Sequence, residues 1–193
     1  MEGVRKAIAE ARFEEVAGIC EDIETEVPEI DHIAEQLYAA EIVGHLYNDN
    51  LNEARFCWKR TPDAVKQTAT MQMVHRLLQC LWSKAYREFH PAIAAFQWAD
   101  PFGGLVKALN EKIVSKIEAI IEQAYSIISV RDFASFLALS PEQAVTVAER
   151  KGWSVDDKKE MIQIRRKDKE STERIPDNSL EQMTKYIVHL DPS

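Results

Sequence analysis

Histidine and cysteine are the side chains that most often bind metals or act as nucleophiles, and the chain contains five histidines and three cysteines. The two nearest histidines, His32 and His45, are 13 positions apart, so no single element presents two of them to one metal ion. The cysteines lie far apart inside apolar helical patterns, which favours buried, reduced thiols; they are Cys20, Cys57 and Cys80. A cysteine and a histidine brought together only by the fold stay open as an alternative, but the spacing indicates no metal and no cofactor.

Glycine motifs do not supply an active site either. Gly103 and Gly104 form the only pair of adjacent glycines, and neither GK[ST] nor GxxG follows them, so no phosphate-binding loop is predicted. The chain also lacks the G-x-S-x-G pattern of serine hydrolases. We therefore expect no catalytic residues and a protein that is not an enzyme.

Two helix caps mark a pair of short helices between residues 129 and 152. Ser129 can cap a helix with apolar residues at helical spacing, namely Phe133, Phe136 and Leu137. Ser140 can cap a second helix, with Pro141 at its first position and Gln143 at N3, and Gly152 closes it. Residues 153–155 and 161–164 then follow as two short strands around a charged turn. Together these elements predict a winged helix with a sheet of two or three strands.

The charges of the second helix argue against reading of DNA by this winged helix. Its polar residues form a near-neutral set: Glu142, Gln143, Thr146, Glu149, Arg150 and Lys151. A groove-reading helix instead presents basic or amide side chains from its N-terminal turns and carries excess positive charge for the phosphates. The whole chain has a formal net charge of -8. A nucleic-acid partner is therefore not expected, although Arg165 and the two basic residues after it could touch a phosphate.

The rest of the chain favours a mainly α fold. Apolar residues recur at helical spacing throughout residues 1–100, and short connections such as 48–50 and 82–84 predict antiparallel hairpins in an irregular, TPR-like helical-repeat stack. We expect the linking helix and the winged-helix module within 101–168, a polar linker at 169–178 and a C-terminal bundle helix at 179–193. No signal peptide and no membrane span is predicted, so an intracellular chain without a membrane partner is expected.

The four tryptophans also need an assignment, because an exposed tryptophan can mark a binding surface while a buried one fills the core. Trp58, Trp82 and Trp98 lie on or beside apolar helical stripes, which favours the core. Trp153 begins the wing, where a large ring would cover the helix pair. We therefore interpret all four as structural.

Four segments carry a family resemblance. The longest, residues 48–62, reads NDNLNEARFCWKRTP, and it is followed by Gln79 to Trp82, by 124–137 and by Gly152 with Trp153. With the predicted order of elements, these segments make the chain resemble the PCI-domain family, whose members are subunits of the proteasome lid, the COP9 signalosome and translation initiation factor three. The match covers roughly residues 38–155 and the closing helix.

The resemblance implies a non-catalytic scaffold or assembly subunit of the COP9 signalosome, the complex that removes the ubiquitin-like protein Nedd8 from cullins, in cytoplasm and nucleus. A small subunit of the proteasome lid or of initiation factor three is the alternative, and a winged-helix nucleic-acid binder is a third. Other PCI subunits would pair with an open sheet edge formed by Met161, Ile162, Gln163 and Ile164. Tail helices of other subunits would form a bundle with a seam of Leu180, Met183, Ile187 and Leu190.

Overall fold

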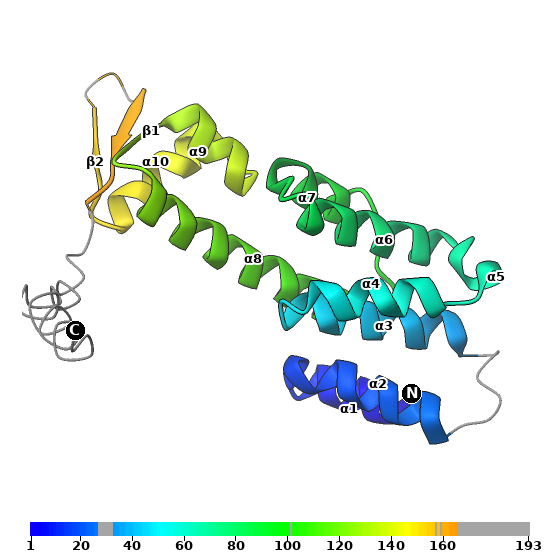
Figure 1. Ribbon diagram of the computed structural model, residues 1–193. Coiled ribbons are helices and arrows are strands. Elements are labelled where there is room, and N and C mark those ends of the chain that lie inside the picture. The colour runs from blue at the N-terminus through cyan, green and yellow to red at the C-terminus, as the bar shows by residue number, and fades with distance from the viewer. Residues whose placement is uncertain (27–32, 101, 157, 159, 166–193) are drawn as a thin grey trace, which may run out of the picture.

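The computed structural model describes residues 1–26, 33–100, 102–156, 158 and 160–165. Within them the chain is mainly helical, and a stack of helices is followed by a small sheet with two more helices (Figure 1). The helices of the stack are α1 (Glu2–Ala9), the 3-10 turn η1 (Phe13–Glu15), α2 (Val16–Glu26), α3 (Ala34–Tyr47), α4 (Leu51–Arg60), α5 (Asp63–Lys66), α6 (Ala69–Trp82) and α7 (Tyr86–Ala94). The predicted mainly α fold is confirmed.

Helix α3 is the centre of the stack, because α2, α4, α6 and α8 all pack against it (Figure 1). Its residues from Leu37 to Leu46 are buried without interruption. A helix that packs against several neighbours needs no continuous polar stripe, which explains why most of these residues are apolar; Glu41 and His45 are the exceptions. Gly44 permits the closest approach, since a Cβ atom at that position would lie 2.9 Å from the backbone nitrogen of Ala17 on α2.

The predicted short connections are confirmed. Asp49, between α3 and α4, has a φ of 61°, and Lys84, between α6 and α7, has a φ of 57°. Each left-handed residue reverses the chain within a few positions, which makes the neighbouring helices antiparallel. Thr68 begins α6 as its N-cap, because its hydroxyl accepts a hydrogen bond from the Met71 backbone.

The long linking helix is α8 (Phe102–Ala124), which has 23 residues and runs from the stack to the sheet (Figure 1). Gly103 and Gly104 lie in its first turn, so the glycine pair belongs to the helix and does not interrupt it. A Cβ atom at Gly104 would lie 3.3 Å from the Ile8 side chain, so the missing side chain lets α1 pack on the start of α8. One stripe of α8 is buried along its length, from Phe102 to Ile121.

The winged-helix module consists of residues 127–165: β1 (Ile127–Ser129), α9 (Val130–Leu137), α10 (Pro141–Arg150), β2 (Ser154–Val155) and β3 (Met161–Gln163). Both predicted caps are confirmed, since Ser129 accepts a hydrogen bond from the Asp132 backbone and Ser140 forms a capping box with Gln143. Gly152 follows α10 with a φ of 74°. The local sequence therefore places this helix pair correctly.

The sheet corrects one prediction about the wing. Its strand order is β1-β3-β2, and both neighbours of β3 are antiparallel to it. The predicted hairpin of β2 and β3 is confirmed, but β1 was not predicted as a strand. Because β3 is the middle strand, Met161, Ile162 and Gln163 do not form an open edge, and the backbone nitrogen of Ile164 also donates to Ser126. The edges belong to β1 and β2.

The module packs on the stack through α7 and α9 (Figure 1). Arg87 on α7 forms an ion pair with Asp132 at 2.8 Å, and its guanidinium lies 4.6 Å from the centre of the Phe136 ring. On the other side, Lys151 after α10 pairs with Glu118 of α8 at 2.8 Å. These contacts join the module to α7 of the stack and to the linking helix α8.

Burial confirms one of the tryptophan assignments and corrects another. Trp153 is buried against Phe133, with ring centres 5.6 Å apart. Trp58 and Trp98 are partly buried, whereas Trp82 is 47% exposed and therefore does not belong to the core. Its apolar helical neighbours predicted burial, but α6 ends at Trp82 and the side chain lies at the surface.

The domain division, the C-terminal segment and the absence of a membrane span were also predicted from the sequence. The division of the chain into domains stays a prediction, and the linker at 169–178 and the helix at 179–193 lie outside the described residues. Among the helices of the described part, none combines the length and apolar character that crossing a membrane requires.

Candidate protein interaction site

The two faces of the sheet differ in polarity. Ile128 on β1 and Ile162 on β3 are directly paired and buried, and they pack on the helix pair. The residues on either side of them along each strand project to the opposite face, because side chains alternate in a strand. Ile127 and Met161 are on that outer face, and they are 54% and 42% exposed.

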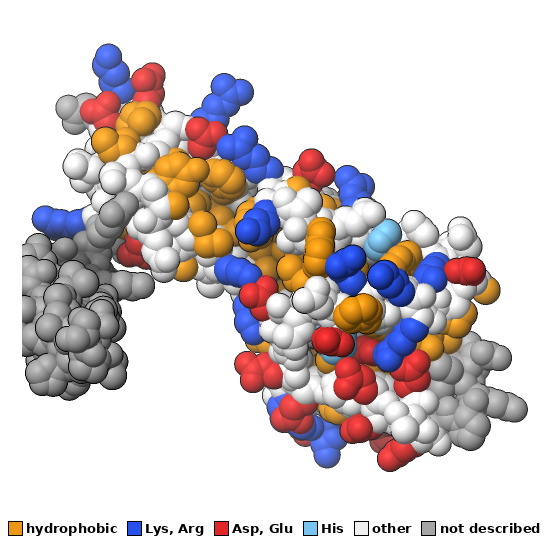
Figure 2. All heavy atoms as spheres, viewed as in Figure 1, with side chains coloured by type: hydrophobic (Ala, Val, Ile, Leu, Met, Phe, Trp, Pro, Cys, Tyr) orange, Lys and Arg blue, Asp and Glu red, His pale blue; other side chains and the backbone are white. Residues whose placement is uncertain are grey.

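Two more apolar side chains are exposed in the segment that leads into β1. Ile120 in the last turns of α8 and Tyr125 directly after the helix are exposed, and Figure 2 shows hydrophobic side chains at the surface of this end of the molecule. Single exposed apolar residues are ordinary, but four within one short region of chain and its paired strand favour a contact surface. We call Ile120, Tyr125, Ile127 and Met161 the apolar sheet surface.

The edge strand β1 presents unpaired backbone groups beside this surface. The Ile164 nitrogen donates to Ser126 and the Val130 nitrogen donates to the Glu160 oxygen, so the even-numbered residues of this segment face β3. Hydrogen-bonded and non-bonded pairs alternate along an antiparallel ladder, so the backbone groups of Ile127 and Ser129 point away from β3. Among the described residues, no further strand pairs with this edge.

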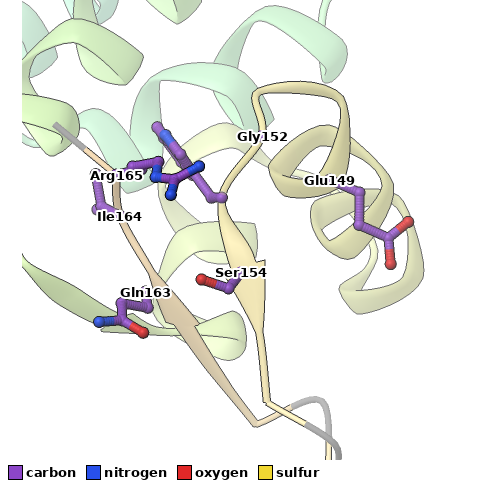
Figure 3. Close-up of a pocket in the computed structure, with 7 residues that line it drawn as sticks. Glu149, Gly152, Ser154, Gln163, Ile164 and Arg165 are labelled. Atoms are coloured by element: carbon purple, nitrogen blue, oxygen red, sulfur yellow. The ribbon is translucent and has the colours of Figure 1, made fainter. Parts of the chain in front are cut away.

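At the other edge, a surface hollow of about 530 Å³ lies between the end of α10 and the strands β2 and β3 (Figure 3). It is lined by Glu149, Gly152, Trp153, Ser154, Gln163, Ile164 and Arg165. Figure 3 shows the two strands side by side and the Glu149 carboxylate extending away from them. Among the described lining residues, neither histidine nor cysteine is present to activate the Ser154 hydroxyl, so this part of the hollow is suited to contact rather than to nucleophilic chemistry.

The predicted partner-binding residues of the wing therefore divide into two pairs. Met161 and Gln163 are exposed on the outer face, whereas Ile162 and Ile164 are buried in the core of the module. Partner binding by the exposed pair stays a prediction. The other four predicted residues, Leu180, Met183, Ile187 and Leu190, lie outside the described residues.

A buried polar cluster that the sequence reading missed joins α2, α3 and α4. Glu41 is 1% exposed, and Arg60 donates a hydrogen bond to it and also pairs with Glu24 at 2.8 Å. The Nε2 atom of His45 lies 3.3 Å from Glu21 and 3.6 Å from Glu41. The spacing of Glu41 and His45, four positions apart on one helix, is a signal that a search for histidine pairs alone does not find.

Three residues of this cluster are of types that bind metal ions. One ligand atom each from Glu21, Glu41 and His45 lies within 4.8 Å of the others, and the second carboxylate oxygen of Glu41 is buried without a hydrogen-bond partner in the described chain. However, the Arg60 guanidinium already supplies a positive charge to Glu41, and Glu21 is half exposed. We interpret the cluster as an ion-pair network that ties three helices together.

The thiols are unsuited to nucleophilic chemistry. Cys20, Cys57 and Cys80 are free and buried, as expected from the sequence. Burial raises the pKa of each thiol, and the Glu41 carboxylate raises it further for Cys20 and Cys57. A thiol that stays protonated at neutral pH is neither a good nucleophile nor a good metal ligand.

Comparison with known proteins agrees with this architecture. The model of the CSN8/PSMD8/EIF3K family matches residues 32–174. This range contains α3, α4, α6, α8 and the whole winged-helix module. The chain belongs to this family.

Curated relatives give the same result over most of the chain. A protein of Arabidopsis thaliana named COP9 signalosome complex subunit 8 is 27% identical over 191 residues, with 97% of each chain covered. The protein of the same name in Danio rerio is 32% identical over 159 residues, covering 81% of this chain and 83% of the relative. That of Xenopus laevis is 29% identical over 182 residues, covering 93% and 92%.

Proposed function

We propose that the chain is a non-catalytic scaffold subunit of the COP9 signalosome and that it takes part, without catalytic residues of its own, in the removal of Nedd8 from cullins. Relatives that cover nearly the whole chain bear the name of a signalosome subunit, which supports membership. The protonated thiols and the charge-matched Glu41 cluster support a non-catalytic role.

The winged-helix module supplies the contact with other subunits in this proposal. The main support for this contact is that β1 has both an exposed apolar side chain of the apolar sheet surface and backbone groups that point away from β3. An incoming strand would satisfy those groups and place its own side chains beside Ile127 on the outer face of the sheet. Edge pairing by the wing strand itself, as first expected, is replaced by pairing at β1.

Proline at Ile127 tests this mechanism. The Ile127 nitrogen points away from β3, so the substitution removes a donor from the free edge and leaves the internal ladder intact. Isolated Ile127→Pro protein should melt close to wild type. When it is tagged and purified from cells, it should recover at least about tenfold less of the partner subunits, because the lost backbone hydrogen bond and the disturbed bonds beside it together weaken binding by about 1.4 kcal/mol or more. Ile127→Val keeps both the donor and the apolar surface, and it should behave as wild type.

Mass spectrometry of the recovered proteins also separates the alternatives. Signalosome subunits are expected; proteasome-lid or initiation-factor subunits in their place would assign the chain to another complex of the same family. Wild-type recovery by the Ile127→Pro protein would exclude β1 as the pairing edge. Tagged chain should be found in both cytoplasmic and nuclear fractions.

The C-terminal segment is proposed as a second partner-binding element. The spacing of Leu180, Met183, Ile187 and Leu190 suits the seam of a helical bundle. Deletion of residues 178–193 should reduce incorporation into the complex and leave the melting temperature of the free chain nearly unchanged. A clearly lower melting temperature with normal incorporation would instead assign this segment to the chain's own fold.

A further inference from the structure

Helices α4 and α6 form a second surface that the proposed function does not use. A hollow of about 310 Å³ lies between them. Its lining combines basic, aromatic and apolar side chains: Arg55, Trp58, Lys59, His75, Leu78, Gln79, Trp82 and Ser83. We call this hollow the α4–α6 groove. Figure 2 shows basic side chains and a histidine among hydrophobic ones over α4 and α6.

The aromatic side chains of the groove are held in place by stacking. The Trp58 and His75 rings are parallel, with an interplanar angle of 3° and centres 4.0 Å apart. The Arg55 guanidinium lies 4.0 Å from the centre of the Trp82 ring, which keeps that exposed ring against α4. A preformed aromatic surface loses little side-chain entropy when a ligand covers it, so it is suited to binding.

The charge of the groove is opposite to that of the chain. None of its described lining residues is a carboxylate, although the chain has a formal net charge of -8. Arg55 and Lys59 have no ion-pair partner among the described residues, whereas Lys66, farther along, pairs with Asp63 at 3.1 Å. Because no ion pair within the described chain neutralises these two cations, they remain available to pair with carboxylates of a ligand.

A neighbouring hollow extends the same chemistry. It shares His75 and Gln79 with the groove and adds Arg76, Met73 and Phe96, and no carboxylate is among the lining residues that the structure describes. The two hollows together follow the exposed side of α6, which gives a strip long enough for several residues of an extended or helical peptide. The floor of the strip is apolar at Leu78 and Trp82, so carboxylates alone would leave part of it uncovered.

We propose that the α4–α6 groove binds an acidic segment of a partner protein that carries a bulky apolar side chain. The carboxylates would pair with Arg55, Lys59 and Arg76, and the apolar side chain would cover Trp82 and Leu78. This inference is independent of the proposed sheet contact, because the groove lies on the stack and not on the winged-helix module.

Peptide titration of the full chain tests the chemistry. The probe is a fluorescein-labelled twelve-residue peptide in which Leu-Phe is flanked by Asp and Glu, with two matched peptides: Lys in place of the acids, and Ala-Ala in place of Leu-Phe. The acidic peptide should bind saturably and change the tryptophan emission, and its affinity should fall with added salt. The two matched peptides should bind at least about tenfold more weakly.

Variants of the chain locate the binding. Arg55→Gln and Trp82→Ala should each weaken the acidic peptide about tenfold, while Lys107→Gln, which removes an exposed charge on α8, should not. Circular dichroism should show that all three variants stay folded. No saturable binding at low salt, equal binding of the basic peptide, or full binding by Trp82→Ala would each overturn the proposal.

Photocrosslinking in cells then identifies the occupant. With benzoylphenylalanine in place of the exposed Gln79, the crosslinked fragment should come from an acidic segment of another protein. A fragment from residues 166–193 of this chain, or from a second copy of it, would contradict binding of a partner segment. Absence of any crosslink in assembled complex would contradict it as well.

Discussion

Glu41 is the most deeply buried charged residue of the described chain, and its carboxylate lies where three helices meet. Arg60 is its main positive partner, and the Arg60 side chain reaches it from the surface of α4. A buried carboxylate that loses its partner keeps the desolvation cost and loses the compensation. Removing one partner should therefore cost more stability than replacing both partners with apolar residues.

A double-mutant cycle tests this reading of Glu41. Arg60→Met should destabilise the fold by up to about 3 to 5 kcal/mol, less to the extent that water reaches the site. Adding Glu41→Met should recover much of that loss, because no buried charge then remains. Urea unfolding measures both values. If the effects of the two substitutions on the free energy of unfolding simply add, Arg60 and Glu41 are not coupled. Glu24→Gln is the control, because it removes the charge of a less buried partner of Arg60.

His75 gives the fold a pH dependence. Burial lowers the pKa of its imidazole, so the folded protein binds the proton less readily than the unfolded chain does. The stability contribution is then complete above the unfolded pKa of about 6.5 and is lost as the pH falls through the folded pKa. His75→Phe keeps a ring to stack on Trp58 and removes the titration.

Thermal melts of wild type and His75→Phe at pH 7.5 and pH 5 test this dependence. The melting temperature of the variant should fall less on acidification than that of wild type. Parallel changes in the two proteins would mean that His75 has no part in the acid sensitivity of the fold. The hollows that His75 lines also contain the cationic Lys59 and Arg76 and the neutral Gln79, and none of their described lining residues is a carboxylate that would offset the charge of a protonated ring.

At the scale of elements, the close packing of α2 on α3 depends on Gly44. A Cβ atom there would lie 2.9 Å from the Ala17 nitrogen and 3.2 Å from the Ala17 Cβ atom, and a backbone atom cannot move without moving the helix. Gly44→Ala should therefore destabilise the protein by about 1 to 3 kcal/mol.

Gly18→Ala is the matched control, because a Cβ atom at Gly18 of α2 meets no atom within 4 Å. That change should stabilise the helix by about 0.5 to 1 kcal/mol, since alanine loses less backbone entropy than glycine. Denaturant unfolding of the two single variants gives opposite signs if the helix contact is as described. Equal effects would mean that α2 adjusts its position freely.

The same scale shows what the sequence could predict. Ser129 and Ser140 placed α9 and α10 correctly because a capping hydrogen bond depends on residues only three positions apart. The order of the strands was missed because β3 pairs with Ile127 and Ile128, more than thirty positions earlier, and no local pattern records that pairing. Once β1 is recognised, the edge moves from Met161 to Ile127.

Exposure was the least predictable property of the candidate sites. Trp58 and Trp82 share an apolar periodicity with buried neighbours, and only the relative placement of α4 and α6 decides that Trp82 is left at the surface. The buried Glu41 was missed for the complementary reason, because a glutamate next to apolar residues on one helix gives no hint of an arginine on another.

At the scale of the whole molecule, α8 determines how the winged-helix module is placed relative to the stack. Lys116 pairs with Asp49 of the stack at 2.6 Å, and Glu118, two positions later, pairs with Lys151 of the module. Residues two positions apart on a helix point about 200° apart, so α8 lies between the two parts and contacts both.

Insertion of one alanine after Ile117 tests this arrangement. It would rotate everything beyond it by about 100° and remove α9 from α7, since the buried stripe of α8 would be broken. Calorimetry should then show two unfolding transitions in place of one, whereas Ser115→Ala on the exposed side should leave a single transition. A single transition in the insertion variant would mean that the packing of the winged-helix module on the stack does not depend on the rotation that α8 imposes between them.

The continuity of α8 also has a consequence for avidity. At about 1.5 Å per residue, its 23 residues span about 35 Å, and no break within it lets the two ends move independently. A partner that bridged the stack and the sheet would bind its second site as an intramolecular event, at an effective concentration that this fixed span determines. Two weak contacts on one rigid body can in that way hold a subunit that neither would hold alone.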